Sequence, residues 1–139
     1  MSVYETGRVI LDGLPHGADL LDAITDLARE NDVETGTVMA IGAVKKARIG
    51  FYDQESREYR ERDIGEPMEI TSCLGNISMK DGEIFVHAHV TLADSEGQVV
   101  GGHLAPGTII FAAECRIAEL RGESLARGYD ETTGLSLWK

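Results

Sequence analysis

The sequence predicts an α+β fold in a single domain, residues 1–139, with a mostly antiparallel β-sheet of about six to eight strands and one or more packed helices. Most apolar segments alternate apolar and polar residues with the period of a strand, and one segment has the period of a helix. Short Gly, Asp and Asn clusters separate the segments as turns do. A length of 139 residues, with 42% hydrophobic and 27% charged residues, suits one globular domain.

The first half of the chain predicts a strand, a helix and a hairpin. A short strand over residues 7–14 is followed by a helix over residues 18–31, where apolar side chains recur at helical spacing and acids fill the first turn. A small apolar strand over residues 37–41 comes next. Residues 46–52 and 57–63 then alternate as a polar hairpin that turns at residues 53–56.

The second half predicts longer strands and a packed tail. A strand over residues 67–78 turns at residues 80–82 into the segment 83–103. The strand over residues 108–120 is apolar on both faces near its start, which places it centrally or at an interface. The tail, residues 125–139, carries Leu135, Leu137 and Trp138, so we expect it to pack on the sheet or against another subunit.

The segment 83–103, EIFVHAHVTLADSEGQVVGGH, places three imidazoles on one face of one hairpin. Strand residues alternate faces, so His87 and His89 point away from the apolar row of Val86, Ala88 and Val90. Their face therefore looks toward solvent, a cleft or a subunit partner.

The turn decides where the third histidine lies. Asp94 to Gly97 has the chemistry of a type I turn followed by a left-handed glycine, which gives a three-residue loop with a bulge. In that register His89 lies opposite His103. A two- or four-residue loop would send His103 to the core side, so the inference depends on Gly97.

Three histidines on one face favour a metal site at His87, His89 and His103. Two histidines on a strand are commonly plain surface groups, and the third, placed by a separate turn argument, shifts the balance toward a ligand set. Neutral imidazole suits zinc and also other divalent transition metals, and three protein ligands leave one position for water or a small anion.

Composition limits the functions that the chain can have. The net charge is −11, with 24 Asp and Glu against 13 Lys and Arg, which disfavours nucleic-acid binding by the chain alone. Lys45, Lys46 and Arg48 are an example of a local basic patch within the acidic chain, and they suit a solvated strand end. Without a signal sequence or an apolar run long enough for a membrane, a cytoplasmic protein is expected. The two isolated cysteines, Cys73 and Cys115, suit small buried hydrophobes.

Three segments together resemble the plants and prokaryotes conserved (PPC) domain. They are GEPMEITSCLGNIS, VHAHVTLADSEGQVVGGHLAPGT and a strand that ends AAECRIAEL; the resemblance covers residues 8–135. It implies a PPC-like antiparallel sheet with flanking helices, assembled as a homotrimer. In prokaryotic members the matching histidines are the suspected metal ligands, here His87, His89 and His103, and zinc is the expected ion. Plant members carry a DNA-binding label together with AT-hook segments, whose Arg-Gly-Arg-Pro core this chain lacks.

Two carboxylates are candidates to complete the site. Glu114 shares a strand row with Ile110 and Ala112, so it could be a fourth ligand or orient an imidazole if that row faces the histidines. A salt bridge with Arg116 is the competing interpretation. Glu69 follows similar logic, although its place in PMEI resembles a Phe-Glu-Ile stretch of the plant domain and favours a structural or interaction role.

Several functions remain open after this reasoning. The leading one is a trimeric metal-binding domain, which as an enzyme would hydrolyse or hydrate a small substrate with zinc-bound water. The alternative is a regulatory or interaction module that contacts DNA or a transcription factor. A cupin-like oxygenase is weaker, because no acid follows the HxH pair and no histidine follows Pro106-Gly107. No nucleophile or catalytic base is assigned, so the sequence leaves enzyme activity undecided.

Overall fold

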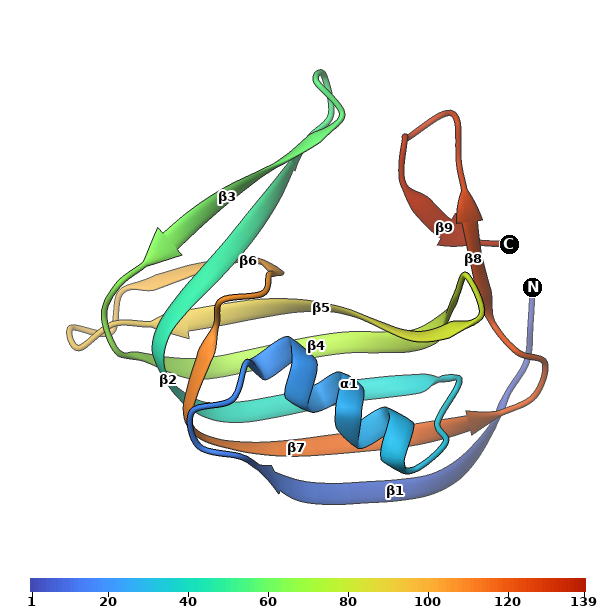
Figure 1. The fold of residues 1–139 in the computed structure, drawn as a ribbon, viewed down its shortest axis with the longest axis horizontal. Helices are drawn as coiled ribbons and strands as arrows, with labels where there is room; N and C mark the ends of the chain where they lie inside the picture. Colours follow the sequence, from blue (N-terminus) through green and yellow to red (C-terminus); the bar gives the residue numbers. More distant parts are fainter.

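The computed structural model describes residues 1–139 as one nine-stranded sheet with one helix (Figure 1). The hydrogen-bonded order is β1-β7-β2-β6-β5-β4-β8-β9, with β3 on β2 and a further β2–β4 pairing. The elements are β1 (Glu5–Leu14), α1 (Leu20–Glu30), β2 (Gly36–Asp53), β3 (Glu58–Ile64), β4 (Met68–Lys80), β5 (Glu83–Ala93), β6 (Val99–Leu104), β7 (Ile109–Arg121), β8 (Ala126–Tyr129) and β9 (Ser136–Trp138). All pairings are antiparallel except β4–β8, so the predicted α+β fold is confirmed.

One long strand, β2, organises the sheet. The two strands predicted over residues 37–41 and 46–52 are one continuous element, bent where its register with β7 shifts between Ala43 and Lys46. Gly42 permits this bend, because its φ of 141° disfavours other residues and an added Cβ would collide with the Ala112 carbonyl. The pairings β2–β4, β4–β5, β5–β6 and β6–β2 close a ring of four strands.

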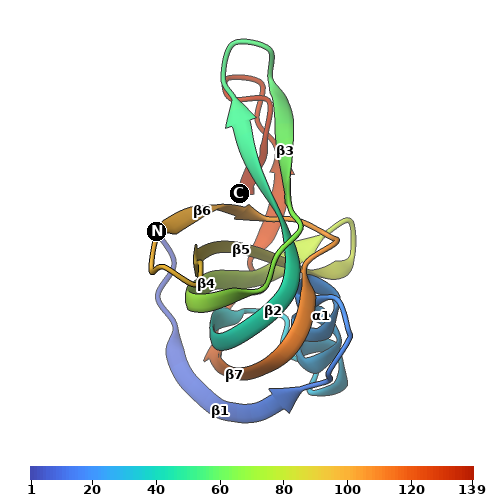
Figure 2. The same cartoon turned by 90° about the vertical axis from the view of Figure 1, so that its left-hand side faces the viewer.

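The helix covers one face of the sheet and completes the core. Asp19 caps α1 by accepting a hydrogen bond from the Asp22 amide at 3.1 Å, and its other oxygen accepts from the Gly107 amide at 2.7 Å. Figure 2 shows α1 lying against the strands. The apolar stripe of α1 is buried in the same core cluster as the inward residues of the strands. The structure has this one helix, and α1 is not long and apolar enough to span a membrane.

The histidine hairpin forms in the predicted register. Gly97 has a φ of 79°, its amide donates to the Asp94 carbonyl at 3.0 Å, and the Asp94 amide donates to the Gln98 carbonyl at 2.9 Å. Val90 therefore faces Gly102, and His89 faces His103. This confirms the argument that a three-residue loop with a left-handed glycine brings His103 to the face of the other histidines.

Strand β7 corrects one part of the sequence interpretation. Ala43 faces Ala112 while Val44 faces Ile110, so Phe111 is an extra residue outside the register. The bulge changes the side-chain rows: Ile110 is buried, whereas Ala112 and Glu114 are exposed. The predicted row of Ile110 with Glu114 is therefore wrong. The central position of β7, between β1 and β2, is confirmed.

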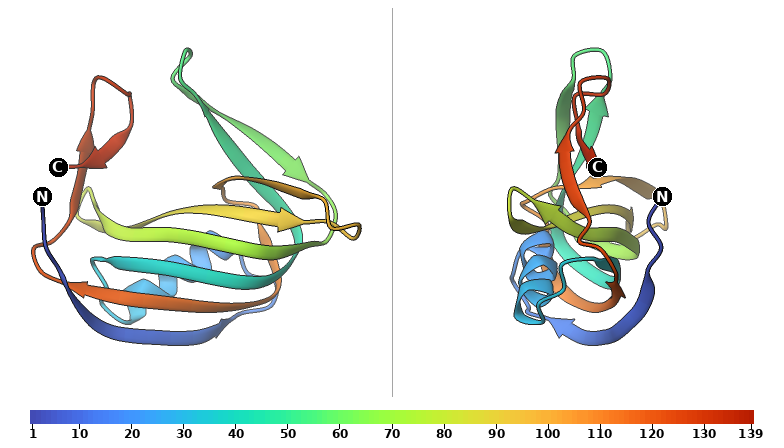
Figure 3. Two further views of the ribbon diagram at one scale, coloured as in Figure 1. Left: turned by 180° about the vertical axis from the view of Figure 1, so that it is seen from behind. Right: turned by 90° about the vertical axis from the view of Figure 1, so that its right-hand side faces the viewer.

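Two hairpins rise from the same side of the sheet (Figures 1 and 3). One is the end of β2 with β3, and the other is β8 with β9. They touch through the Tyr52 hydroxyl, which donates to the Thr133 carbonyl at 2.7 Å, and through Arg57, which donates to the Glu131 carbonyl at 3.1 Å. Since β8 pairs with β4, the tail packs on the sheet as expected.

Candidate metal centre

The three predicted histidines form a cluster on the outward face of the β5–β6 hairpin. One candidate ligand atom from each of His87, His89 and His103 lies within 4.8 Å of the other two. The ring centroids are 5.1 Å apart for His87 with either partner and 5.9 Å apart for His89 with His103. No other group of three metal-ligating side chains occurs in the structure.

The spacing suits a small adjustment onto one ion. Zinc–nitrogen bonds of about 2.0–2.1 Å at tetrahedral angles place neighbouring nitrogens roughly 3.3 Å apart. The three ligand atoms, within 4.8 Å of one another, are therefore at most about 1.5 Å farther apart than a tetrahedral site requires.

Burial favours the neutral, metal-binding form of two of the three histidines, His87 and His103. Desolvation, followed by the charges of His103 and His89, lowers the pKa of His87 from 6.5 to about 4. Burial and then the charge of His89 lower the pKa of His103. A neutral imidazole offers a lone pair, whereas a protonated one offers none.

One atom of the cluster lacks a partner. The Nδ1 atom of His103 is buried and makes no hydrogen bond, although an unsatisfied buried polar atom costs about 1–3 kcal/mol. The Tyr59 ring, with centroids 4.8 Å apart, and the backbone of Gly50 lie against this side chain. An orphaned buried nitrogen on one of three clustered imidazoles fits a metal ligand, so the residues present fit the ion that the sequence predicts.

A cleft of about 540 Å³ opens beside the histidines. Asn76 pairs with His87 and Leu74 with His89, so β4 supplies one wall. Met39 and Thr37 of β2 extend it. Within a single chain the cluster is therefore open on this side of the sheet.

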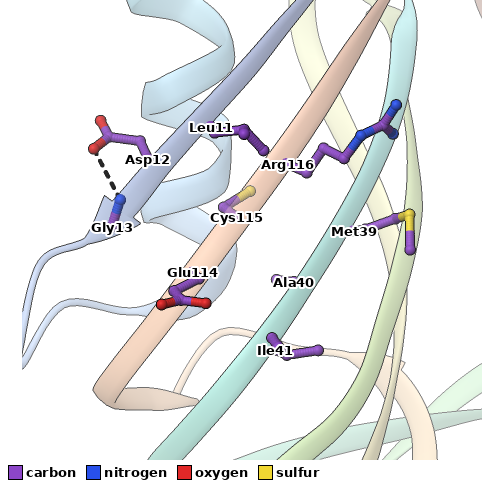
Figure 4. Close-up of a pocket in the computed structure, with 9 residues that line it drawn as sticks. All are labelled: Leu11, Asp12, Gly13, Met39, Ala40, Ile41, Glu114, Cys115 and Arg116. Atoms are coloured by element: carbon purple, nitrogen blue, oxygen red, sulfur yellow. Dashed lines mark hydrogen bonds between the residues drawn. The ribbon is translucent and has the colours of Figure 1, made fainter.

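The two carboxylates do not join the cluster within the chain. Glu114 lies on β7 opposite Gly13 and Ile41, where it lines a separate cavity of about 620 Å³ on the side of the sheet away from α1 (Figure 4). Glu69 pairs with Ala43 and lines another cleft. Neither supplies a fourth ligand to its own chain, and Glu114 also makes no ion pair with Arg116.

Sequence reasoning missed two neighbours of the cluster. Tyr59 arrives on β3 and Arg127 on β8, and the Arg127 charge contributes to the lowered pKa of His87. No local pattern marks either residue. Trp138 in the tail was the one available signal, since it predicted that this segment returns to the sheet.

Comparison with known families identifies the fold. The model of the Plants and Prokaryotes Conserved (PCC) domain matches residues 1–121. The chain belongs to this family. It is the PPC family of the sequence resemblance, which is confirmed.

Solved structures of relatives agree over the whole chain. A metal-containing protein from Archaeoglobus fulgidus is 42% identical with a TM-score of 0.95, and the match covers 100% of this chain and 98% of that one. A PPC protein from Pyrococcus horikoshii is 39% identical with a TM-score of 0.94, covering 99% and 94%. A protein from Ralstonia eutropha JMP134, for which DNA binding has been suggested, is 26% identical with a TM-score of 0.83, covering 98% and 94%.

A curated relative matches this chain within a larger protein. The bifunctional protein GlmU of Synechococcus sp. is 34% identical over 120 residues, which are 85% of this chain and 18% of that protein. The chain thus spans less than a fifth of the length of this relative.

Proposed function

We propose that this PPC-domain protein binds one zinc ion per chain through His87, His89 and His103, with water or a small anion in the fourth position. The buried, unpartnered Nδ1 of His103 inside the three-imidazole cluster carries the proposal. The relative from Archaeoglobus fulgidus supports it, because that protein contains metal and is 42% identical along the whole chain.

Zinc is the best match among divalent metals. Three imidazoles with one open position are a known zinc arrangement, and the absence of a carboxylate in the group disfavours the two-histidine, one-carboxylate site of non-haem iron enzymes. Bound zinc would act as a Lewis acid and lower the pKa of a bound water. The chain supplies the three donors and a cleft beside them.

We propose further that the protein is a homotrimer. Large apolar side chains on the sheet face away from α1 are exposed: Leu11 by 74%, Ile41 by 55%, Leu74 by 55% and Met39 by 49%. Contiguous exposed apolar surface typically marks an interface, and cyclic symmetry closes such a surface on copies of itself. Light scattering coupled to size-exclusion chromatography should give three times the mass of 15.1 kDa. A monomer would refute this assembly.

The metal proposal is tested with protein purified without a polyhistidine tag. We expect about one zinc per chain by elemental analysis in the wild type, and near-complete loss after His87→Ala or His103→Ala. The fourth histidine provides the control: His16 contacts the Phe111 carbonyl at 2.6 Å and lies outside the cluster. His16→Ala should keep full metal content. Unchanged stoichiometry in the cluster variants would sink the proposal.

DNA binding is the second candidate function, because it has been suggested for the Ralstonia relative. In this chain the local basic patch is reduced: Arg48 pairs with Asp63 at 2.7 Å and Glu61 at 3.5 Å, which leaves Lys45 and Lys46. With a net charge of −11, we expect no salt-dependent retention on duplex DNA at physiological ionic strength. Such retention, measured by anisotropy of a labelled duplex, would favour the DNA-binding function.

A further inference from the structure

We propose that Arg127 and the bound metal together form a binding site for a small dianionic ligand, such as a dicarboxylate. This inference rests on the proposed metal site and adds the chemical class of the molecule in its open position. It involves β8 and β9, which lie beyond the residues that the family model matches.

Strand register places Arg127 on the face of the histidines. Asn76 pairs with His87 and Ser78 pairs with Phe85, so these four side chains share one face in adjacent rows. Arg127 donates from Nε to the Ser78 hydroxyl at 2.8 Å, and its guanidinium lies 5.3 Å from the Phe85 ring centroid. Residues two apart on a strand are about 7 Å apart. The guanidinium, which contacts Ser78 and lies over Phe85, therefore occupies the row next to His87, and its charge acts on that imidazole.

The position of Arg127 is rigid, yet part of its donor capacity is unused. The guanidinium lies 5.5 Å from the Trp138 ring and also donates from Nη1 to the Ser136 carbonyl at 3.1 Å. Nη2 donates no hydrogen bond within the chain. A guanidinium held by aromatic rings, one side-chain hydroxyl and one backbone carbonyl presents its remaining edge in a fixed direction.

No carboxylate neutralises this charge. Arg127 takes part in none of the ion pairs of the chain, and neither does Lys80, whose Nζ lies 5.0 Å from the centroid of the same Phe85 ring. Two cations without an ion pair thus lie at the Phe85 ring, in a chain whose net charge is −11. The nearby Glu61, whose charge acts on His103, is 3.5 Å from Arg48. A half-buried cation without a counterion gains from an anionic ligand.

The surroundings define the size and character of the ligand. One acidic group would occupy the open metal position, and the second would accept from Nη2 of Arg127 about 7 Å along the strand direction. The rings of Phe85 and Tyr59 provide apolar contacts for the carbon atoms between them. A four- or five-carbon dicarboxylate has this form, whereas a monocarboxylate reaches one of the two charges.

The test uses succinate and acetate as probes of the cobalt-substituted protein. The visible spectrum of cobalt reports coordination of the anion, and the fluorescence of Trp138, the one tryptophan of the chain, reports events at Arg127. We expect succinate to change both signals with one midpoint and to bind at least about tenfold more tightly than acetate. Arg127→Gln should remove this advantage while leaving metal content and acetate binding unchanged.

Matched variants separate local contacts from overall charge. Arg29→Gln removes the same charge on α1, on the opposite side of the sheet, and should leave succinate binding unchanged. Arg127→Lys keeps the charge without the fork of donors and should give intermediate affinity. Equal affinities for succinate and acetate in the wild type, or an undiminished affinity in Arg127→Gln, would overturn the inference.

Failure of the metal proposal gives a different result. In that case the protein retains neither zinc nor cobalt. The contact between succinate and Arg127 is then tested with the metal-free protein. Succinate should still change Trp138 fluorescence in the wild type and not in Arg127→Gln. If succinate changes Trp138 fluorescence in neither the cobalt-substituted nor the metal-free wild type, the inference is overturned.

Discussion

Gly102→Ala is a sensitive test of how the fold holds the third histidine. Only two residue pairs join β6 to β2, Ile49 with Leu104 and Gly50 with His103, and they close the ring of four strands. Gly102 precedes His103 directly. A Cβ at this position would lie 2.6 Å from the Gly50 carbonyl oxygen, which is backbone and cannot rotate away.

The geometry sets the size of the effect. Ordinary contact begins near 3.4 Å, so β6 must move from β2 by about 0.8 Å to relieve the 2.6 Å approach. Inserting a methyl group into packed structure with such a shift costs about 1–3 kcal/mol. We therefore expect a loss of about 2 kcal/mol in the free energy of unfolding. The displacement of His103 should also weaken zinc binding by about tenfold or more.

Urea denaturation at equal protein concentrations, followed by zinc competition with a chromophoric chelator, measures both effects. Gly13→Ala is the matched control, because an added Cβ at Gly13 on β1 meets no atom within 4 Å. This control should be neutral or stabilising by up to about 1 kcal/mol. If Gly102→Ala behaves like the control in both assays, the argument that glycine is required for the close approach of β6 is wrong.

Three further predictions concern titration and reactivity. Arg8 lowers the pKa of Glu119 to about 2, below the 4.5 of an ordinary glutamate, so this pair stabilises the fold above pH 4.5 and its contribution disappears toward pH 2. The stability difference between wild type and Glu119→Gln in urea should shrink across that window; a constant difference would contradict it. Three ordinary histidines would release roughly 2.7 protons when zinc binds at pH 5.5. Because the pKa of His87 is about 4 and that of His103 is also lowered, calorimetry in two buffers should show a release smaller by at least about one proton. Burial raises the pKa of the Cys73 thiol to about 12 and of Cys115 to about 11, so Ellman's reagent at pH 8 should react with them only after unfolding; rapid reaction of the folded protein would argue against their burial.

The cluster could be predicted because its geometry depends on local chemistry. A strand alternates its faces, and the loop from Asp94 to Gly97 has one preferred turn, so the pairing of His89 with His103 followed from residues close in sequence. The helix could be predicted for the same reason, since its apolar period and the acids of its first turn are also local.

Features that depend on distant strands could not be predicted. The bend of β2 at Gly42 and the bulge of β7 at Phe111 adapt these two strands to each other. The sequence of one strand does not determine its register with the other. The bulge reversed the rows of β7 and moved Glu114 away from Ile110. Arg127 reaches the histidine face through a parallel pairing with β4, which no turn signal announces.

The position of β2 in the chain affects its synthesis. Every strand that pairs with β2 follows it in sequence, and the last of them, β7, ends at Arg121, 68 residues after Asp53. At about 5–20 residues per second, a ribosome needs roughly 3–14 seconds to add those residues. During that interval the backbone donors and acceptors of β2 have no complete set of partners. We expect the nascent chain to depend on chaperones in this period, and folding to finish only after release of β7 from the exit tunnel.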